Sequence, residues 1–307
     1  MAAWREVTGG LMFPEGPVAM PDGSVLVVEI ARGTLTRILP DGTHQIVAHT
    51  GGGPNGAAIG PDGRCYVCNN GGFKWHEETG IRRPILQAED YGGGRIERVD
   101  LETGAVEVLY TGAEGVTLRG PNDIVFDAHG GFWFSDLGKV RARDWDRSGV
   151  WYGRADGSGL KEVVFPMITA NGVGLSPEGD RLYVAETQTG RLWAFEITGP
   201  GEIRRDPWPS PHGGRLLANA PGYQNFDSLA VDADGNICVA TLFSGGITVI
   251  SPDGKVLDFV EFPDPYTTNI CFGGPDLRTA YVTLSMTGRL VAMDWPRPGL
   301  RLNYQTL

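Results

Sequence analysis

The chain has 307 residues, of which 41% are hydrophobic and 21% are charged, so it can bury a large core. Its formal net charge of −11 argues against general binding to nucleic acids or anionic membranes, because both need a basic face. No apolar run reaches the roughly 18 residues of a membrane span, and Met1–Val7 lacks the apolar stretch of a signal peptide. We therefore expect a soluble cytoplasmic protein without a nucleic-acid, membrane or obligatory protein partner.

One short pattern recurs six times along the chain. A polar residue opens an apolar alternating run, a turn follows, and a second strand-like run comes back. The turns are of the type Pro21-Asp22-Gly23, and the 46 Gly and 21 Pro suit many short strands joined by tight turns. The six polar residues that open the units are Glu15, Asn55, Asn122, Asn171, Asp227 and Asn269.

Further strands follow within each unit. A Gly precedes a third strand, as in Gly190–Phe195, and a fourth often comes next, as in Ala105–Tyr110. Four short antiparallel strands are typical of one propeller blade, and blade repeats run to roughly 40–50 residues. The unit starts lie about 51 residues apart on average. The sequence therefore predicts an all-β fold: a single six-bladed β-propeller over residues 1–307, with Trp4–Val7 as the outer strand of the last blade.

Two stretches interrupt the repeat. Asn69–Gly94 holds Trp75, His76 and Tyr91 among mixed charges. A long insertion of this kind is either a functional lid or a simple surface decoration, and the sequence leaves both interpretations open. Pro200–Tyr223 carries five Pro and is expected to run irregularly over the surface.

The four cysteines are predicted to be buried thiols. Cys65 and Cys68 form a CxxC, but it lies in a strand-like run, where residues three apart point to opposite faces. Without a second CxxC or a nearby His, neither a zinc nor a redox site is favoured. We expect Cys238 and Cys271 to be buried apolar thiols as well.

The polar openings of the units point to a metal site. The first strand of each blade lines the central channel of a propeller, so these residues should form a ring. Glu15 and Asp227 would repel each other if buried together, and a divalent cation would resolve that conflict. With the amide oxygens of Asn122 and Asn171 they make an all-oxygen ligand set, which favours Ca²⁺, Mg²⁺ or Mn²⁺ and leaves positions for water or substrate.

Any one of these residues could instead be an ordinary strand start or Asx turn. Four at matching repeat positions favour a shared site. Asn55 and Asn269 occupy the same repeat position and are interpreted as substrate contacts or structural caps.

Four segments carry a specific combination of residues: Phe13–Pro17, Pro121–Asp123, Ala170–Ser176 and Phe226–Asp232. Together they resemble the senescence-marker-protein, gluconolactonase and luciferin-regenerating enzyme family, over nearly the whole chain. The resemblance implies a six-bladed propeller with one catalytic divalent metal, often Ca²⁺ and sometimes Zn²⁺, Mn²⁺ or Fe²⁺. It places Glu15, Asn122, Asn171 and Asp227 at the metal-ligand positions, and Asp227 also at that of the proposed acid/base.

One position departs from the family pattern. Mammalian-type members carry a substrate-binding Arg two residues before the Asn that corresponds to Asn122. Here that position is Gly120, and the nearest Arg is Arg119. We take Arg119, Asn55 and Trp75 as candidate substrate contacts.

The function implied by this resemblance is that of a metal-dependent lactonase, a hydrolase that opens a cyclic ester such as a sugar lactone. A small-molecule lactone is then the expected partner. Two alternatives remain open. One is a related metal-dependent esterase or phosphotriesterase, and the other is a propeller scaffold that binds a protein or peptide and holds a purely structural cation.

Overall fold

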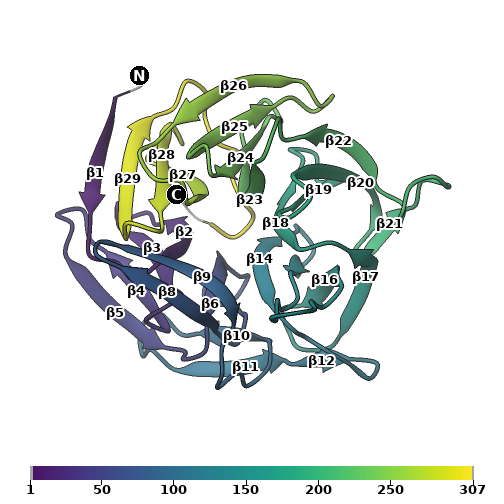
Figure 1. Ribbon diagram of the computed structural model, residues 1–307, viewed down its shortest axis with the longest axis horizontal. Coiled ribbons are helices and arrows are strands. Elements are labelled where there is room, and N and C mark those ends of the chain that lie inside the picture. Colours follow the sequence, from purple (N-terminus) through teal and green to yellow (C-terminus); the bar gives the residue numbers. More distant parts are fainter. Residues whose placement is uncertain (1–2, 306–307) are drawn as a thin grey trace.

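Six antiparallel sheets surround a central axis. The computed structural model describes residues 3–305, and every regular element within them is a β-strand. Viewed down the axis, the sheets follow one another around a ring as the blades of a propeller (Figure 1). The predicted all-β, six-bladed propeller is confirmed. No helix in this described range is long and apolar enough to cross a bilayer.

The blades follow the six units of the sequence. Blades 1 and 2 consist of β2 (Pro14–Ala19), β3 (Val25–Glu29), β4 (Thr34–Ile38) and β5 (His44–His49), then β6 (Pro54–Ile59), β7 (Cys65–Asn69), β10 (Arg95–Val99) and β11 (Val106–Tyr110). Blades 3 and 4 consist of β14 (Pro121–Phe126), β15 (Gly131–Asp136), β16 (Ser148–Arg154) and β17 (Leu160–Met167), then β18 (Ala170–Leu175), β19 (Arg181–Glu186), β20 (Arg191–Gly199), β21 (Glu202–Arg204) and β22 (Arg215–Asn219). Blades 5 and 6 consist of β23 (Asn225–Val231), β24 (Ile237–Leu242), β25 (Gly246–Ile250) and β26 (Val256–Glu261), then β27 (Thr267–Gly273), β28 (Thr279–Leu284), β29 (Arg289–Asp294) and β1 (Trp4–Thr8). Two hairpins lie outside the blades. β8 (Phe73–Glu78) with β9 (Ile81–Gln87) is inserted between β7 and β10 of blade 2, and β12 (Gly112–Ala113) with β13 (Val116–Thr117) follows blade 2 in the chain.

The N-terminal strand closes the ring. β1 pairs with β29, with Trp4 opposite Met293, so that residues from opposite ends of the chain share blade 6. This confirms the prediction that Trp4–Val7 supplies the outer strand of the last blade.

The turn between the first two strands is similar in all six blades. In blades 1 to 5 it carries a glycine with a positive φ, for example 81° at Gly23 and 74° at Gly63, a backbone region that favours glycine. In blade 6 Leu277 takes this position, with a φ of 59°. The carboxylate of Asp22 accepts the backbone N–H of Ser24 at 2.9 Å, as expected of an Asx turn. These local interactions explain why the unit boundaries were visible in the sequence.

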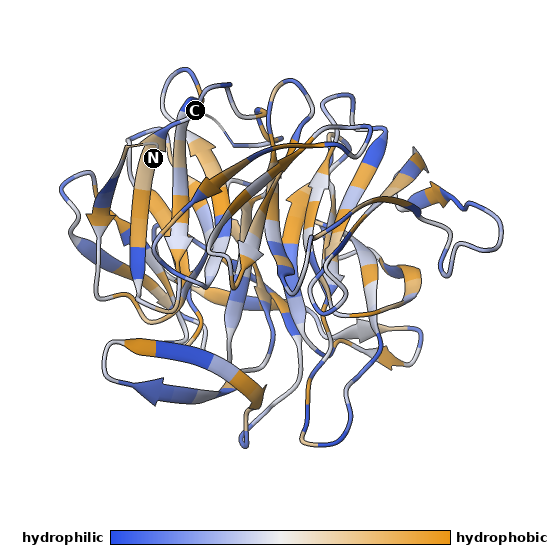
Figure 2. Ribbon diagram, turned by 45° about the horizontal axis from the view of Figure 1, so that its top comes forward, coloured by the Kyte–Doolittle hydropathy of each residue, from blue (hydrophilic) through white to orange (hydrophobic). Residues whose placement is uncertain are grey.

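The core lies between neighbouring blades. Trp133 of β15 packs in one cluster with Val184 of β19 and Phe195 of β20, across the interface between blades 3 and 4. In Figure 2 hydrophobic residues fill much of the strands, and inner strands such as β2 and β14 are buried along their whole length because neighbouring blades cover both of their faces.

Blade 4 differs from the prediction. The stretch Pro200–Tyr223 was expected to be irregular, and this is wrong in part, because it contributes β21 and β22. Both strands pair with β20, which is nine residues long. β22 pairs with its first half and β21 with its second, so the length of β20 makes room for both.

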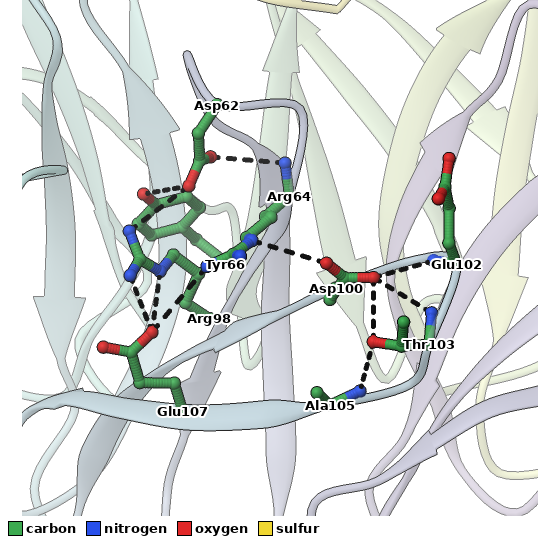
Figure 3. Close-up of polar contacts among 9 residues, drawn as sticks. All are labelled: Asp62, Arg64, Tyr66, Arg98, Asp100, Glu102, Thr103, Ala105 and Glu107. Carbon is green, nitrogen blue, oxygen red and sulfur yellow. Dashed lines mark hydrogen bonds and ion pairs between the residues drawn. The ribbon is translucent and has the colours of Figure 1, made fainter.

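An exposed polar network covers the outside of blade 2 (Figure 3). The guanidinium of Arg98 donates to Glu107 at 2.6 Å and to Asp62 at 3.3 Å. It therefore links the outermost strand to the turn between the first two strands. Exposed ion pairs of this kind contribute only about 0–1 kcal/mol each.

The four cysteines are unpaired and buried. Burial raises the pKa of the Cys65 thiol to about 12, which keeps it protonated. The prediction of buried thiols is confirmed.

Candidate active site

The innermost strands share an irregularity next to their polar residues. Their pairing with the second strand shifts register in every blade, for example between Glu15 and Val18 in β2 and between Phe226 and Leu229 in β23. A bulge turns side chains out of the regular alternation and often lies beside a functional site. It allows a polar residue to open a strand that is otherwise buried on both faces.

Glycines next to these bulges let neighbouring inner strands approach closely. A Cβ atom at Gly16 would lie 2.6 Å from the carbonyl oxygen of Asn55, and one at Gly172 would lie 2.7 Å from that of Asp227. Real Cβ atoms do not come this close to backbone oxygens. The residue that follows Glu15 or Asn171 must therefore be glycine if the blades are to meet at this level.

The polar residues converge on one cavity. A cavity of about 230 Å³ is lined by Glu15, Asn55, Asn122, Asn171 and Asp227, which come from the first strands of five blades. The structure thus brings the four predicted metal ligands together with the predicted substrate contact Asn55.

Asn269, the sixth residue of the ring, does not line this cavity. It lines a smaller cavity of about 70 Å³ further along the axis. Its amide donates to the Glu15 carboxylate at 2.9 Å. Of the two roles predicted for Asn269, this contact agrees with a structural cap.

The two carboxylates in the cavity are electrostatically strained. Burial raises the pKa of Glu15 to about 7, although hydrogen bonds from the Asn269 amide and the Gly16 N–H oppose the rise. Burial also raises the pKa of Asp227 well above its ordinary value, and the negative charge of Glu15 raises it further. The Asn171 amide donates to Asp227 at 2.6 Å and partly offsets this. A positive charge between them would relieve the strain.

The amide oxygens fit a cation as well. Oδ1 of Asn122 is buried and has no hydrogen-bond partner among residues 3–305, which is costly unless something else occupies its lone pairs. Oδ1 of Asn171 accepts a long hydrogen bond of 3.3 Å from Ser228. Two carboxylates and two amide oxygens suit a hard divalent cation. Within residues 3–305 no group of three or more His, Cys, Asp or Glu is arranged to hold a metal, so the candidate site depends on the amides.

Asp123 is a further acidic residue at the site that the sequence did not predict. This buried carboxylate accepts the backbone N–H of Val173 in the next blade at 3.1 Å. Burial raises its pKa to about 7, and the charge of Glu15 adds to the rise. The sequence did hold a sign of it. Glu15 and Asn171 are each followed by Gly, whereas Asn122 is followed by an acidic residue.

Two other candidate substrate contacts do not line the cavity. The Trp75 ring packs against Phe13 and Phe73, with centroid distances of 5.1 and 6.1 Å, and does not line the cavity. Arg119 is exposed and lines a separate cleft with Arg147. The structure does not bring either side chain to the predicted ligands.

The insertion after β7 lies over part of the cavity mouth. Its hairpin, β8 and β9, lies in front of blades 1 and 2 in Figure 1, and Phe73 and Leu86 line the cavity. The N–H of Arg82 donates to Met286 O in blade 6 at 3.0 Å, and that of Gln87 donates to Val140 O in blade 3 at 2.8 Å. The hairpin therefore bridges two blades across the mouth, which favours the lid over a surface decoration. We call it the lid hairpin.

Comparisons with known proteins agree with this fold. The sequence model of a family described as SMP-30/Gluconolactonase/LRE-like region matches residues 13–286. The chain is 27% identical over 263 residues to lactonase drp35 of Staphylococcus saprophyticus, covering 85% of this chain and 73% of that protein. It is 31% identical over 184 residues to a 6-deoxy-6-sulfogluconolactonase of Pseudomonas putida, covering 58% of this chain and 59% of that protein. The crystal structure of regucalcin from Agrobacterium tumefaciens, a calcium-binding protein, has a TM-score of 0.74 at 17% identity, covering 98% of both chains. At that identity the likeness supports the fold alone.

Proposed function

This chain belongs to the SMP-30/gluconolactonase/LRE-like family, and on that premise we propose that it is a divalent-metal-dependent hydrolase that opens a cyclic ester. Relatives named lactonase and 6-deoxy-6-sulfogluconolactonase support a lactone-hydrolysing enzyme. A small-molecule lactone is then its partner.

One observation carries the proposal: the oxygen donors of four blades share a cavity. Glu15, Asn122, Asn171 and Asp227 would hold the cation, and the unpartnered Oδ1 of Asn122 argues that the site is built for one. Ca²⁺ is favoured for this donor set, with Zn²⁺, Mn²⁺, Mg²⁺ or Fe²⁺ as alternatives. A cation bound there supplies an electrophile for the carbonyl oxygen of the lactone.

The side chains of the cavity provide the rest of the mechanism. Asp227 takes a proton from the attacking water, whose oxygen forms a bond to the carbonyl carbon. The bond from that carbon to the ring oxygen then breaks, and the ring oxygen takes up the proton from Asp227 to give a hydroxy acid. The Asn171 amide, 2.6 Å from Oδ1 of Asp227, holds this carboxylate in place.

Two further features favour an enzyme over a binding scaffold. The cavity of about 230 Å³ beside the four oxygen donors offers room for a substrate. The lid hairpin lies over part of it and would limit the entry of bulk water, and Asn55 offers an amide to the polar atoms of a bound lactone. A scaffold with a purely structural cation needs neither feature.

The proposal is tested by lactone hydrolysis. We expect purified protein to hydrolyse δ-valerolactone or glucono-1,5-lactone, and chelation followed by gel filtration to abolish the activity until Ca²⁺ is restored. Asp227→Asn should lower kcat at least ~100-fold, because a positioned general base contributes about 10²–10⁴-fold. Glu107→Gln, at an exposed carboxylate on the outside of blade 2, is the control. Rates that survive both chelation and Asp227→Asn would rule out the mechanism.

A further inference from the structure

The cavity has two walls of opposite character. One carries the carboxylates and amides described above, together with Thr187, Gln188 and Asn225. The other is apolar and includes Pro84, Ile85 and Leu86 from the lid hairpin, with Phe243 and Tyr266 from the loops of blades 5 and 6. Among the described residues that line the cavity there is no Lys, Arg or His.

Aromatic rings continue this apolar wall around the mouth. Tyr223 and Phe243 are stacked, with their ring centroids 5.2 Å apart and an interplanar angle of 4°. Phe243 meets Tyr266 edge-on at 6.3 Å, and Tyr266 meets Phe13 at 6.1 Å. Phe13 in turn contacts Trp75 of the lid hairpin at 5.1 Å. The rim therefore offers both ring faces and ring edges, which an aromatic group prefers as neighbours.

Two of these aromatic residues have a strained backbone. Phe13 has a φ of 57° and Phe243 a φ of 74°, a region that bulky residues rarely adopt. Hydrogen bonds hold both in place: Phe13 O accepts the N–H of Ile30, and the N–H of Phe243 donates to Pro265 O. Strained residues of this kind cluster at ligand sites, and both rings line the cavity.

A sugar lactone suits this wall poorly. It carries several hydroxyl groups, and each one that lost its water against Phe243 or Leu86 would need a new hydrogen-bond partner. An aryl group placed there has no hydrogen bond to water to lose. Its contact with the wall would bury apolar surface of both the ligand and the protein.

We infer that the preferred substrate is a lactone that carries an aryl substituent. The carbonyl would face the polar wall and the aryl group the aromatic rim. This inference rests on the proposed lactonase function and adds the substrate class to it.

The test compares three six-membered lactones: glucono-1,5-lactone, unsubstituted δ-valerolactone and δ-phenyl-δ-valerolactone. We expect kcat/KM for the phenyl compound to exceed both others at least tenfold. Phe243→Ala should lower the phenyl value at least tenfold more than the δ-valerolactone value, mainly through KM. Phe259→Ala is the matched control, because Phe259 lies on β26 of the same blade and is 40% exposed, compared with 38% for Phe243.

The outcomes separate the two proposals. If none of the three lactones is hydrolysed, the proposed function fails. If glucono-1,5-lactone is the best substrate, the inference is overturned while the lactonase function stands. If Phe243→Ala does not fold, Phe243→Leu replaces it, since it keeps an apolar side chain and removes the ring. Equal losses for the phenyl and unsubstituted lactones would assign Phe243 a structural role and overturn the inference.

Discussion

A buried lysine anchors the lid hairpin. Nζ of Lys139 donates to Oδ1 of Asn70 at 3.0 Å and to the carbonyl oxygen of Gly72 at 2.9 Å. It also lies 4.1 Å from the centroid of the Phe73 ring. These three residues form the base of the hairpin, where the chain leaves blade 2. A single side chain from blade 3 thus positions a wall of the cavity.

Stability should respond to pH through this residue. Burial lowers the pKa of Lys139 from 10.5 to about 7. Between these values the unfolded chain binds a proton at this position that the folded chain does not, so the free energy of unfolding rises with pH, by up to about 1.4 kcal/mol per pH unit. Lys139→Met removes this contribution. The wild type should therefore gain stability relative to Lys139→Met between pH 7 and pH 10 in urea titrations.

The control is Lys255→Met, at a side chain that is 77% exposed. Its stability should follow that of the wild type over the same pH range. Parallel curves for the wild type and Lys139→Met would contradict the prediction.

The same local arrangement, repeated in several inner strands, brings their polar side chains together at the axis. A polar residue at a bulge is followed by a residue whose size sets the spacing to the next blade. In blades 1 and 4 that residue is glycine, and in blade 3 it is Asp123, whose carboxylate accepts the backbone N–H of Val173 across the gap. The ring therefore depends on backbone contacts between blades as much as on its polar side chains.

Enlarging one of these glycines should open the ring. In Gly172→Ala the new Cβ atom would lie 2.7 Å from the carbonyl oxygen of Asp227 and 2.8 Å from the backbone nitrogen of Leu229, so β18 and β23 must separate. We expect a loss of about 1–3 kcal/mol in the free energy of unfolding, the usual cost of overpacking. The stabilisation by Ca²⁺ should fall as well. Both are measured by thermal unfolding with and without the ion.

Gly92→Ala serves as the control, because a Cβ atom at Gly92 would meet no atom of the described residues within 4 Å. Its melting temperature and its response to Ca²⁺ should match the wild type. A Gly172→Ala variant as stable and as responsive as Gly92→Ala would show that the close approach of the strands is not required.

At the level of the whole molecule, the proposed cation would join blades 1, 3, 4 and 5 at the axis, while the pairing of β1 with β29 closes the ring at its outer edge. The cation would hold the blades together at the centre of the ring, and the strand pairing holds them together at its outer edge. Without a cation, Glu15 and Asp227 repel each other at the point where these blades meet.

Cation binding should therefore stabilise the fold. At a free concentration of about 100 times Kd, a ligand that binds only the folded chain adds about 2.7 kcal/mol. For a chain of this size that corresponds to several degrees in Tm. Calorimetry of chelated protein, with Ca²⁺, Mg²⁺, Mn²⁺ or Zn²⁺ added back, would measure the shift and rank the ions. The proposal of one domain over residues 1–307 predicts a single transition.

Asp227→Asn should abolish the shift, and without a cation it should be at least as stable as the wild type, because the repulsion from Glu15 is gone. Asp253→Asn, at an exposed carboxylate, is the control. A wild type whose Tm responds to none of these ions would contradict the metal site.

The sequence by itself determined the architecture: six units, their turns, the closure by Trp4–Val7 and the polar residues that head each inner strand. It could do so because alternation and turn chemistry are local properties, as Gly23 and Gly63 show. Only the tertiary structure decided that Asp123 joins the buried carboxylates, that Asn269 lies behind Glu15 and that Trp75 stands outside the cavity. It also revealed the aromatic rim. These features depend on bulges and on contacts between blades far apart in the chain, which no local pattern encodes.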